Sequence, residues 1–179
     1  MSSHAVRRIV ALASAFTLLA TIALTTIGAQ DSGTTTPAAT PSVPAVVRDV
    51  LAADLPAAAP GQELQLVRYI IQPETRLATH VHPGTQIASI ASGVLTYTVL
   101  TGEVPVLRAV ADGTPIPAET VRAGQTTHLH PGDAVVERPG AVHFGENRGS
   151  EPVVILAATL LTAGQPAAIP VNDQGTPVS

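Results

Sequence analysis

The sequence predicts an all-β domain, either a sandwich or a barrel, that follows an apolar N-terminal segment. After Gly61 the chain consists of short apolar or alternating runs, interrupted at regular spacing by Pro and Gly, which is typical of strands and tight turns. No stretch beyond Gly61 has a helical period. Because only 2% of the residues are aromatic, the core must be built from Val, Ile, Leu and Ala, which suits a barrel interior.

The first 29 residues begin with positive charge and continue as an apolar run. Arg7 and Arg8 precede an uncharged stretch from Ile9 to Ala29 that ends in small residues. This pattern is typical of an export signal peptide, but the run is also long enough to span a bilayer as an uncleaved anchor. We therefore expect an exported protein, secreted or extracytoplasmic, which contacts a membrane only if this segment is retained.

The rest of the chain divides into a linker, a domain and a tail. Residues 30–45 are rich in Thr, Pro and Ala and lack apolar periodicity, which indicates a linker. Residues 46–164 form the predicted domain, large enough for one core. Residues 165–179 carry several Pro and no pattern, and we expect a flexible tail.

Within the domain, the strands are predicted in the following order: Glu63–Gln72, Leu77–His82, Gln86–Ala91, Val94–Leu100, Val104–Val110, Glu119–Arg122, Thr126–His130, Ala134–Arg138, Ala141–Glu146 and Pro152–Leu161. The earlier stretch Val46–Leu55 fits either a strand or a helical turn. The run Val153–Leu161 is apolar on both faces, which indicates a central strand or one buried at an oligomer contact.

Composition excludes several classes of function. All 9 basic residues are Arg, so a phosphate-loop Lys, a Schiff-base Lys and a polybasic nucleic-acid surface are excluded. Nucleic acid is therefore not expected as a partner. The chain contains no Cys, so any metal must be held by His, carboxylate or amide groups.

The candidate chemistry lies in the histidines. His80 and His82 are two residues apart in a predicted strand, so both rings project from one face. Gln86 opens the next strand after the Pro83-Gly84 turn, and its amide oxygen is close enough to join the same centre. His143 comes from a distant strand. Imidazoles that converge from several strands suit a divalent transition metal with open coordination positions.

A second His-x-His pair, His128 and His130, also precedes a Pro-Gly turn. It is interpreted as the edge of a strand entering that turn, with the alternative that one of the two rings reaches the pocket. Asn147 is expected to fix a loop through hydrogen bonds from its side chain to the backbone. Tyr97 and Phe144 are expected in the core, and Glu137 and Glu146 are expected to be solvated.

These motifs resemble those of the cupins, and in particular a small single-domain cupin of the type-2 kind. His80-Val81-His82, Gln86 and Gly93 match the first cupin motif, and Gly132, Pro139-Gly140, His143 and Asn147 match the second. The resemblance covers about Gly61 to Leu161. It implies a cupin-type β-barrel, that is, a double-stranded β-helix or jelly-roll. Pairing of edge strands, common among cupins, implies a homodimer.

Three residues depart from the cupin pattern. Glu74 stands where the first motif begins with Gly, which is expected to change only a turn. Arg138 stands where the second motif has Pro. Gln86 stands in the position of the metal-binding Glu, so the first motif supplies no negative charge to the centre. A neutral amide is a weaker ligand than a carboxylate, which favours Fe²⁺, Cu²⁺, Ni²⁺ or Zn²⁺ over Mn²⁺.

Two functions remain open from the sequence. One is an exported, metal-dependent enzyme, either a dioxygenase-like oxidoreductase or an isomerase. In this enzyme His80, His82 and His143 bind one divalent transition metal and Gln86 assists. The resemblance then implies a small organic substrate such as an enolate, a catechol-like compound or a keto acid. The other is a non-catalytic barrel that binds a small ligand or a metal, which the missing Glu favours. No catalytic acid or base can be assigned from the sequence.

Overall fold

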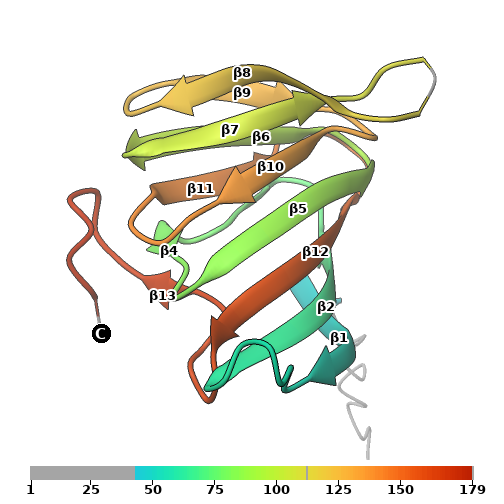
Figure 1. The fold of residues 1–179 in the computed structure, drawn as a ribbon. Coiled ribbons are helices and arrows are strands. Elements are labelled where there is room, and N and C mark those ends of the chain that lie inside the picture. Colours follow the sequence, from blue (N-terminus) through green and yellow to red (C-terminus); the bar gives the residue numbers. More distant parts are fainter. Residues whose placement is uncertain (1–42, 112, 179) are drawn as a thin grey trace, which may run out of the picture. The chain divides into compact units, whose positions relative to one another are not determined.

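The computed structural model describes residues 43–111 and 113–178, which form strands and turns (Figure 1). The predicted signal or anchor segment 1–29 and most of the predicted linker lie outside the described residues. Within the described part of the chain, no helix is long and apolar enough to cross a membrane. The all-β prediction is confirmed, and the strands form two antiparallel sheets.

The larger sheet has seven strands in the order β1-β2-β12-β5-β10-β7-β8. These strands are β1 (Val46–Asp54), β2 (Gln62–Ile71), β12 (Val153–Thr162), β5 (Thr85–Ser92), β10 (Ala134–Glu137), β7 (Glu103–Arg108) and β8 (Ile116–Arg122). The strand that was predicted to be central from its two apolar faces is β12, which pairs with β2 on one side and β5 on the other.

The second sheet has the order β13-β4-β11-β6-β9, with β3 pairing to β11 beside this path. Its strands are β3 (Thr75–Arg76), β4 (His80–Val81), β6 (Leu95–Thr101), β9 (Thr126–Leu129), β11 (Val142–Asn147) and β13 (Ile169–Pro170). Strands that follow one another in the sequence therefore often belong to different sheets. Conversely, strands that are paired, such as β4 and β11, are far apart in the sequence.

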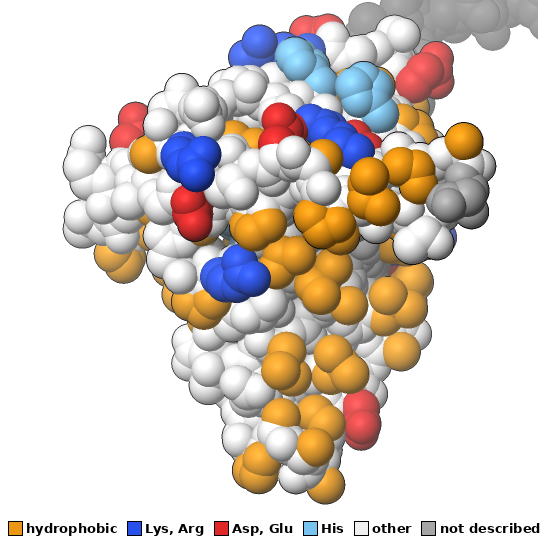
Figure 2. Space-filling model, turned by 45° about the horizontal axis from the view of Figure 1, so that its top comes forward, with side chains coloured by type: hydrophobic (Ala, Val, Ile, Leu, Met, Phe, Trp, Pro, Cys, Tyr) orange, Lys and Arg blue, Asp and Glu red, His pale blue; other side chains and the backbone are white. Residues whose placement is uncertain are grey.

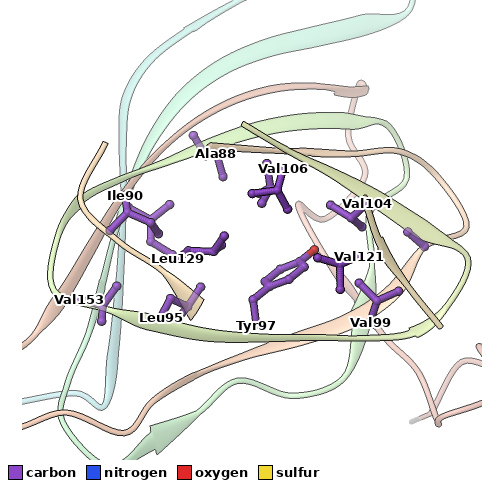
Figure 3. Packing of buried hydrophobic residues seen from close by; sticks show 14 of the residues in the cluster. Ala88, Ile90, Leu95, Tyr97, Val99, Val104, Val106, Val121, Leu129 and Val153 are labelled. Atoms are coloured by element: carbon purple, nitrogen blue, oxygen red, sulfur yellow. The ribbon is translucent and has the colours of Figure 1, made fainter. Parts of the chain in front are cut away.

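The core lies between the two sheets and consists mainly of Val, Ile, Leu and Ala. In Figure 3, Ile90 and Val106 from the larger sheet point into the same interior as Leu95, Val99 and Leu129 from the smaller sheet. All of these side chains are buried. Burial of branched apolar side chains from both sheets supplies the main favourable free energy of folding, as the scarcity of aromatic residues predicted.

Three segments differ from the sequence prediction. Of the predicted strand Leu77–His82, only His80 and Val81 form a strand, β4, while β3 precedes it at Thr75–Arg76. Both pair with β11, and the Leu77 N–H between them donates to the Gly145 carbonyl oxygen of β11 at 2.9 Å. The ambiguous stretch Val46–Leu55 is a strand, β1. The segment predicted as a flexible tail contributes β13, which pairs with β4 and closes the edge of the smaller sheet.

Two turns, one before β3 and one after β4, restrict which residue can occupy them. Glu74 has φ of 57° and is the one non-glycine residue with positive φ among the described residues. It stands at the position where the first cupin motif has Gly, which adopts this conformation without steric cost. Gly84 packs so closely against β12 that a Cβ would lie 2.1 Å from the carbonyl oxygen of Leu160. A residue with a Cβ at this position would force the backbone of the turn or of β12 to shift.

The outer face of the larger sheet carries exposed apolar side chains. Leu64, Leu66, Ile87 and Leu156 on β2, β5 and β12 are each more than two fifths exposed. In the space-filling view, charged and histidine side chains gather toward the top, and apolar side chains occupy much of the surface below (Figure 2). The outward half of the doubly apolar strand β12 is therefore left uncovered in a single chain.

Candidate metal centre

Three histidines converge where β4 meets β11. His80 and His143 face each other directly in the pairing of these strands, and His82 follows the end of β4. The ring centroids lie 4.4 to 5.2 Å apart. One nitrogen from each ring lies within 4.8 Å of the others. His82 and His143 are buried and His80 is half-buried, so the cluster predicted from the two motifs forms inside the barrel.

The other nitrogen of each ring is fixed by the backbone. Each Nδ1 donates to a carbonyl oxygen: that of Ala78 for His80 (2.8 Å), Ala167 for His82 (2.6 Å) and Ala141 for His143 (3.0 Å). Because a carbonyl oxygen only accepts, the hydrogen resides on Nδ1 and Nε2 is left to bind a metal. Contacts of this kind orient metal-binding histidines and fix their tautomer.

Glu137, at the end of β10, lies against this cluster, and the expectation that it is solvated is wrong. Its side chain is buried. Its Oε2 lies 3.1 Å from Nε2 of His82 and its Oε1 lies 3.1 Å from Nε2 of His143. The Gln86 amide nitrogen donates to Oε2 at 2.6 Å and the Tyr97 hydroxyl donates to Oε1 at 2.8 Å. A carboxylate is therefore present at the centre, although Gln86 replaces the Glu of the first motif.

A signal for this position was present in the sequence. β10 alternates between half-buried and buried residues, so Glu137 faces inward in phase with the apolar Val135. In the antiparallel pairing of β10 with β5, Glu137 stands directly opposite Gln86. A Glu on the inward face of an otherwise apolar strand predicts a paired, buried carboxylate rather than a solvated one.

The buried groups shift one another's pKa. Burial, together with the His143 and His82 imidazoles, lowers the pKa of His80 to about 4. Burial alone would lower the pKa of His143, but the Glu137 carboxylate raises it. Burial alone would raise the pKa of Glu137, but the two imidazoles hold it well below its usual value. Burial and Glu137 raise the pKa of Tyr97 well above its usual range. At neutral pH, His80 is neutral, Glu137 is ionised and Tyr97 is protonated.

Gln86 lies at the centre, as predicted, with an orientation that the sequence could not give. Its amide nitrogen faces Glu137 and lies 3.3 Å from Nε2 of His82. Its oxygen, Oε1, is buried and has no hydrogen-bond partner in the described part of the chain. Its role as a metal ligand stays a prediction.

The histidine cluster opens into a cavity of about 230 Å³ between the sheets. Most of the wall is apolar, with side chains from both sheets and from the C-terminal segment, among them Tyr69, Leu77, Ile90, Leu129, Ile155 and Pro170. The polar groups of the wall gather at the histidine end, where His82, Gln86 and Glu137 lie. Among the described residues that line the cavity, none is Arg.

Other predicted residues lie as follows. His128 and His130 are exposed, with buried Leu129 between them, so the interpretation of this pair as a strand edge is confirmed. Asn147 is buried and its amide nitrogen donates to the carbonyl oxygens of Ile71 and Glu151, both at 2.9 Å, which confirms its role in fixing a loop.

Of the two aromatic residues expected in the core, one is there. Tyr97 is buried, and it also lines the cavity. Phe144 is only half-buried, and the guanidinium of Arg76 lies 3.8 Å from its ring centroid. The core expectation for Phe144 is wrong because residues 143, 145 and 147 of β11 take the inward positions.

Comparison with known proteins gives matches in structure only. No protein-family model and no curated protein matches the sequence. Similar solved structures include a cupin 2 domain-containing protein from Halorhodospira halophila, with 14% identity over 75% of this chain and 77% of that chain and a TM-score of 0.48. KdgF from Halomonas sp. has 16% identity over 67% and 83% of the two chains and a TM-score of 0.44.

A chain from the crystal structures of DMSP lyases has 15% identity over 61% of this chain and a TM-score of 0.43, and the match spans 44% of that chain.

The two facing antiparallel sheets, with histidines of both motifs brought together on β4 and β11, are the arrangement that the cupin motifs predicted. The chain has a cupin-type fold. Within this cupin-type barrel, the first motif contributes His80 and His82 and the second contributes His143, and the cluster that they form suits a metal ion.

Proposed function

We propose that the protein binds one divalent transition metal through His80, His82 and His143 and uses it to convert a small, largely apolar organic molecule. The observation that carries the proposal is the convergence of three buried or half-buried imidazoles, each with Nδ1 held by a backbone carbonyl oxygen. Imidazole ligands suit Fe²⁺, Cu²⁺, Ni²⁺ and Zn²⁺ better than Mn²⁺.

The residues at the centre fit such an ion. Three nitrogen donors within 4.8 Å of one another can reach one metal with small side-chain movements. His80, with a pKa of about 4, stays neutral above that pH and keeps its lone pair available. The unpartnered oxygen of Gln86 is a buried polar atom beside the cluster, and buried polar atoms normally have a partner.

The cavity supports a substrate without a formal charge. An anionic substrate would bring a buried charge into a wall that is mostly apolar and, among the described residues, contains no Arg to pair with it. Of the substrate types that the cupin resemblance implies, a catechol-like compound fits this wall better than a keto acid. The expected substrate places one polar donor at the histidine end and its apolar body against residues such as Leu77 and Ile155.

A divalent metal at this centre supplies a Lewis acid or a platform for O₂ or substrate. The side chains and backbone of this chain orient the imidazoles, exclude water and hold a proton near the cavity. The carbonyl contacts hold the imidazoles in place, the apolar wall excludes water, and the protonated Tyr97 hydroxyl donates to Glu137 at the edge of the cavity.

One observation favours the alternative of a non-catalytic binding barrel. Among the described residues of the cavity wall, the groups able to exchange a proton are the histidine cluster, the Glu137–Tyr97 pair and the Tyr69 hydroxyl, and no Asp, Lys or further His lines it. A binding barrel would show a ligand-dependent rise in the thermal unfolding temperature without product, whereas an enzyme would form product in a metal-dependent manner.

Metal content tests the proposal. Plasma mass spectrometry is applied to the full chain, to His143→Ala and to the matched control His128→Ala, which removes an exposed histidine from β9. We expect about one equivalent of metal in wild type and in the control and little in His143→Ala. A wild-type protein that holds no metal under any supplementation, or a His143→Ala variant that retains it, contradicts the proposal.

We further propose that the protein is exported and forms a homodimer. The charge and apolar pattern of residues 1–29 supports export, and the N-terminal sequence of protein isolated from extracytoplasmic fractions tests it. The dimer is a prediction from the edge-strand pairing that is common among cupins. A monomeric mass by light scattering across a concentration series contradicts the dimer.

A further inference from the structure

We propose that Glu137 is the anionic ligand of this metal centre and that it takes the place of the Glu that Gln86 replaces in the first cupin motif. The inference rests on the proposed function, since it concerns the same metal. It changes the nature of the centre from three neutral imidazoles and an amide to three imidazoles and a carboxylate. The carboxylate comes from β10 and not from β5.

The first support is distance. Two ligand atoms that each lie about 2.1 Å from one ion, at a right angle to each other, are about 3.0 Å apart. The Oε2 atom of Glu137 lies 3.1 Å from Nε2 of His82, and Oε1 lies 3.1 Å from Nε2 of His143. Each carboxylate oxygen thus stands at the separation expected for neighbouring ligands, Oε2 relative to His82 and Oε1 relative to His143. Among the described residues, the ligand atoms that all lie within 4.8 Å of one another are those of the three histidines alone, so Glu137 would move slightly to join an ion held by all three.

The second support is charge. Glu137 is 4% exposed, and a buried carboxylate needs a positive partner. The chain has no Lys, and no Arg lines the described cavity wall. The partner must therefore be a protonated imidazole or a bound cation. A divalent cation satisfies the carboxylate and leaves all three imidazoles neutral, which is the form in which they bind metals.

The third support is the pairing of β5 with β10. Gln86 and Glu137 are directly opposed and both face inward, so a carboxylate on either strand reaches the same centre. The Gln86 amide nitrogen donates to Oε2 of Glu137 at 2.6 Å, which positions the carboxylate. In this arrangement the amide and the carboxylate have exchanged strands, and Gln86 is a positioning residue.

Exchange of the two side chains tests the inference. The full-length wild type, Glu137→Gln and the double variant Gln86→Glu/Glu137→Gln are titrated with Zn²⁺ against a competing chelator, and their Co²⁺ complexes are examined by visible absorption. Glu103→Gln is the matched control because Glu103 is an exposed carboxylate on β7. His143→Ala reports loss of the whole site.

We expect Glu137→Gln to weaken Zn²⁺ binding by more than about 100-fold, beyond the 10- to 100-fold typical of residues that only orient ligands. Its Co²⁺ spectrum should also change, because the band positions and intensities depend on the ligand set. The double variant should regain most of the affinity, since a carboxylate again reaches the centre. Glu103→Gln should bind as wild type does.

The outcomes separate this inference from the proposed function. If wild type binds metal, His143→Ala does not, and Glu137→Gln keeps the wild-type spectrum, Glu137 is not a ligand and the proposed function stands. If wild type binds no metal, the proposed function fails. If Glu137→Gln does not fold, the double variant decides: a folded double variant that does not bind Zn²⁺ overturns the inference.

Discussion

Glu74→Gly is expected to stabilise the protein, although it deletes a side chain. Glu74 has φ of 57°, in the left-handed region, which costs a residue with a Cβ about 1–2 kcal/mol. Gly removes that cost but makes the unfolded chain more flexible, which costs about 0.4–1 kcal/mol. The net gain is about 0.5–1 kcal/mol, or about 1–4 °C in thermal midpoint for a chain of this size. Differential scanning calorimetry of the full chain measures it.

The matched control is Glu74→Ala, which removes the same carboxylate and keeps the Cβ that causes the strain. We expect Glu74→Ala to leave stability unchanged or slightly lower, and Glu74→Asn to lie between the two, because Asn tolerates the left-handed region better than most residues. Equal stabilisation by Ala and Gly would show that the exposed charge, and not the backbone, is responsible. A destabilised Glu74→Gly would refute the reasoning.

Three further predictions concern the supports of the site. Gly84→Ala should lower the free energy of unfolding by about 1–3 kcal/mol, because its Cβ would lie 2.1 Å from the Leu160 carbonyl oxygen, and urea denaturation should detect the loss. Asn147→Asp should cost about 3 kcal/mol, because a carboxylate would face the two carbonyl oxygens that the amide nitrogen now bonds; an unchanged urea midpoint would contradict this. Burial alone would raise the pKa of Asp133, but backbone N–H groups and the Arg108 guanidinium outweigh it and lower the pKa. The Asp133 carboxylate therefore stabilises the fold above pH 3.8, its unfolded value, and this stability is lost as the pH falls through the lower folded pKa. Asp133→Asn should flatten the acid limb of a stability–pH curve, and parallel curves for the two proteins would exclude this role.

The histidine cluster could be predicted because its spacing is local and its motif positions are specific. His80 and His82 are two residues apart, which places both on one face of any strand, and the Pro83-Gly84 turn marks its end. His143 followed from the second motif alone, because periodicity cannot show that β11 lies beside β4. The sequence therefore predicted the members of the cluster, and the structure supplied the direct opposition of His80 and His143.

Glu137 shows what was harder to predict. A Glu side chain is more often solvated than buried, whereas the alternation along β10 places Glu137 on the inward face in phase with Val135. Three of its four partners, His82, Gln86 and Tyr97, are distant in the sequence. Interactions of that kind are set by sheet pairing, which a pattern along a single strand does not contain.

The C-terminal segment was missed for a different reason. Residues 165–179 have neither apolar periodicity nor strand propensity, because β13 is only two residues long and only isolated side chains of the segment, such as those of Pro170 and Val171, are buried or line the cavity. The rest of its contribution comes from backbone atoms. Val171 donates its backbone N–H to the Thr79 carbonyl oxygen, and Ala167 offers only its carbonyl oxygen to His82. Backbone contacts of this kind leave no signature in the side chains.

The hydrogen bond from His82 to the Ala167 carbonyl oxygen connects the histidine cluster to the C-terminal segment. The ribosome adds His82 85 residues before Ala167, so a growing chain contains all three imidazoles while one of them still lacks its backbone acceptor. The ring of His82 is held in its final orientation only after residue 167 has been made and has packed beside β4. We therefore expect the histidine cluster to reach its final geometry only once this segment is in place, and proteolytic removal of the segment around Ala167 to release the His82 ring.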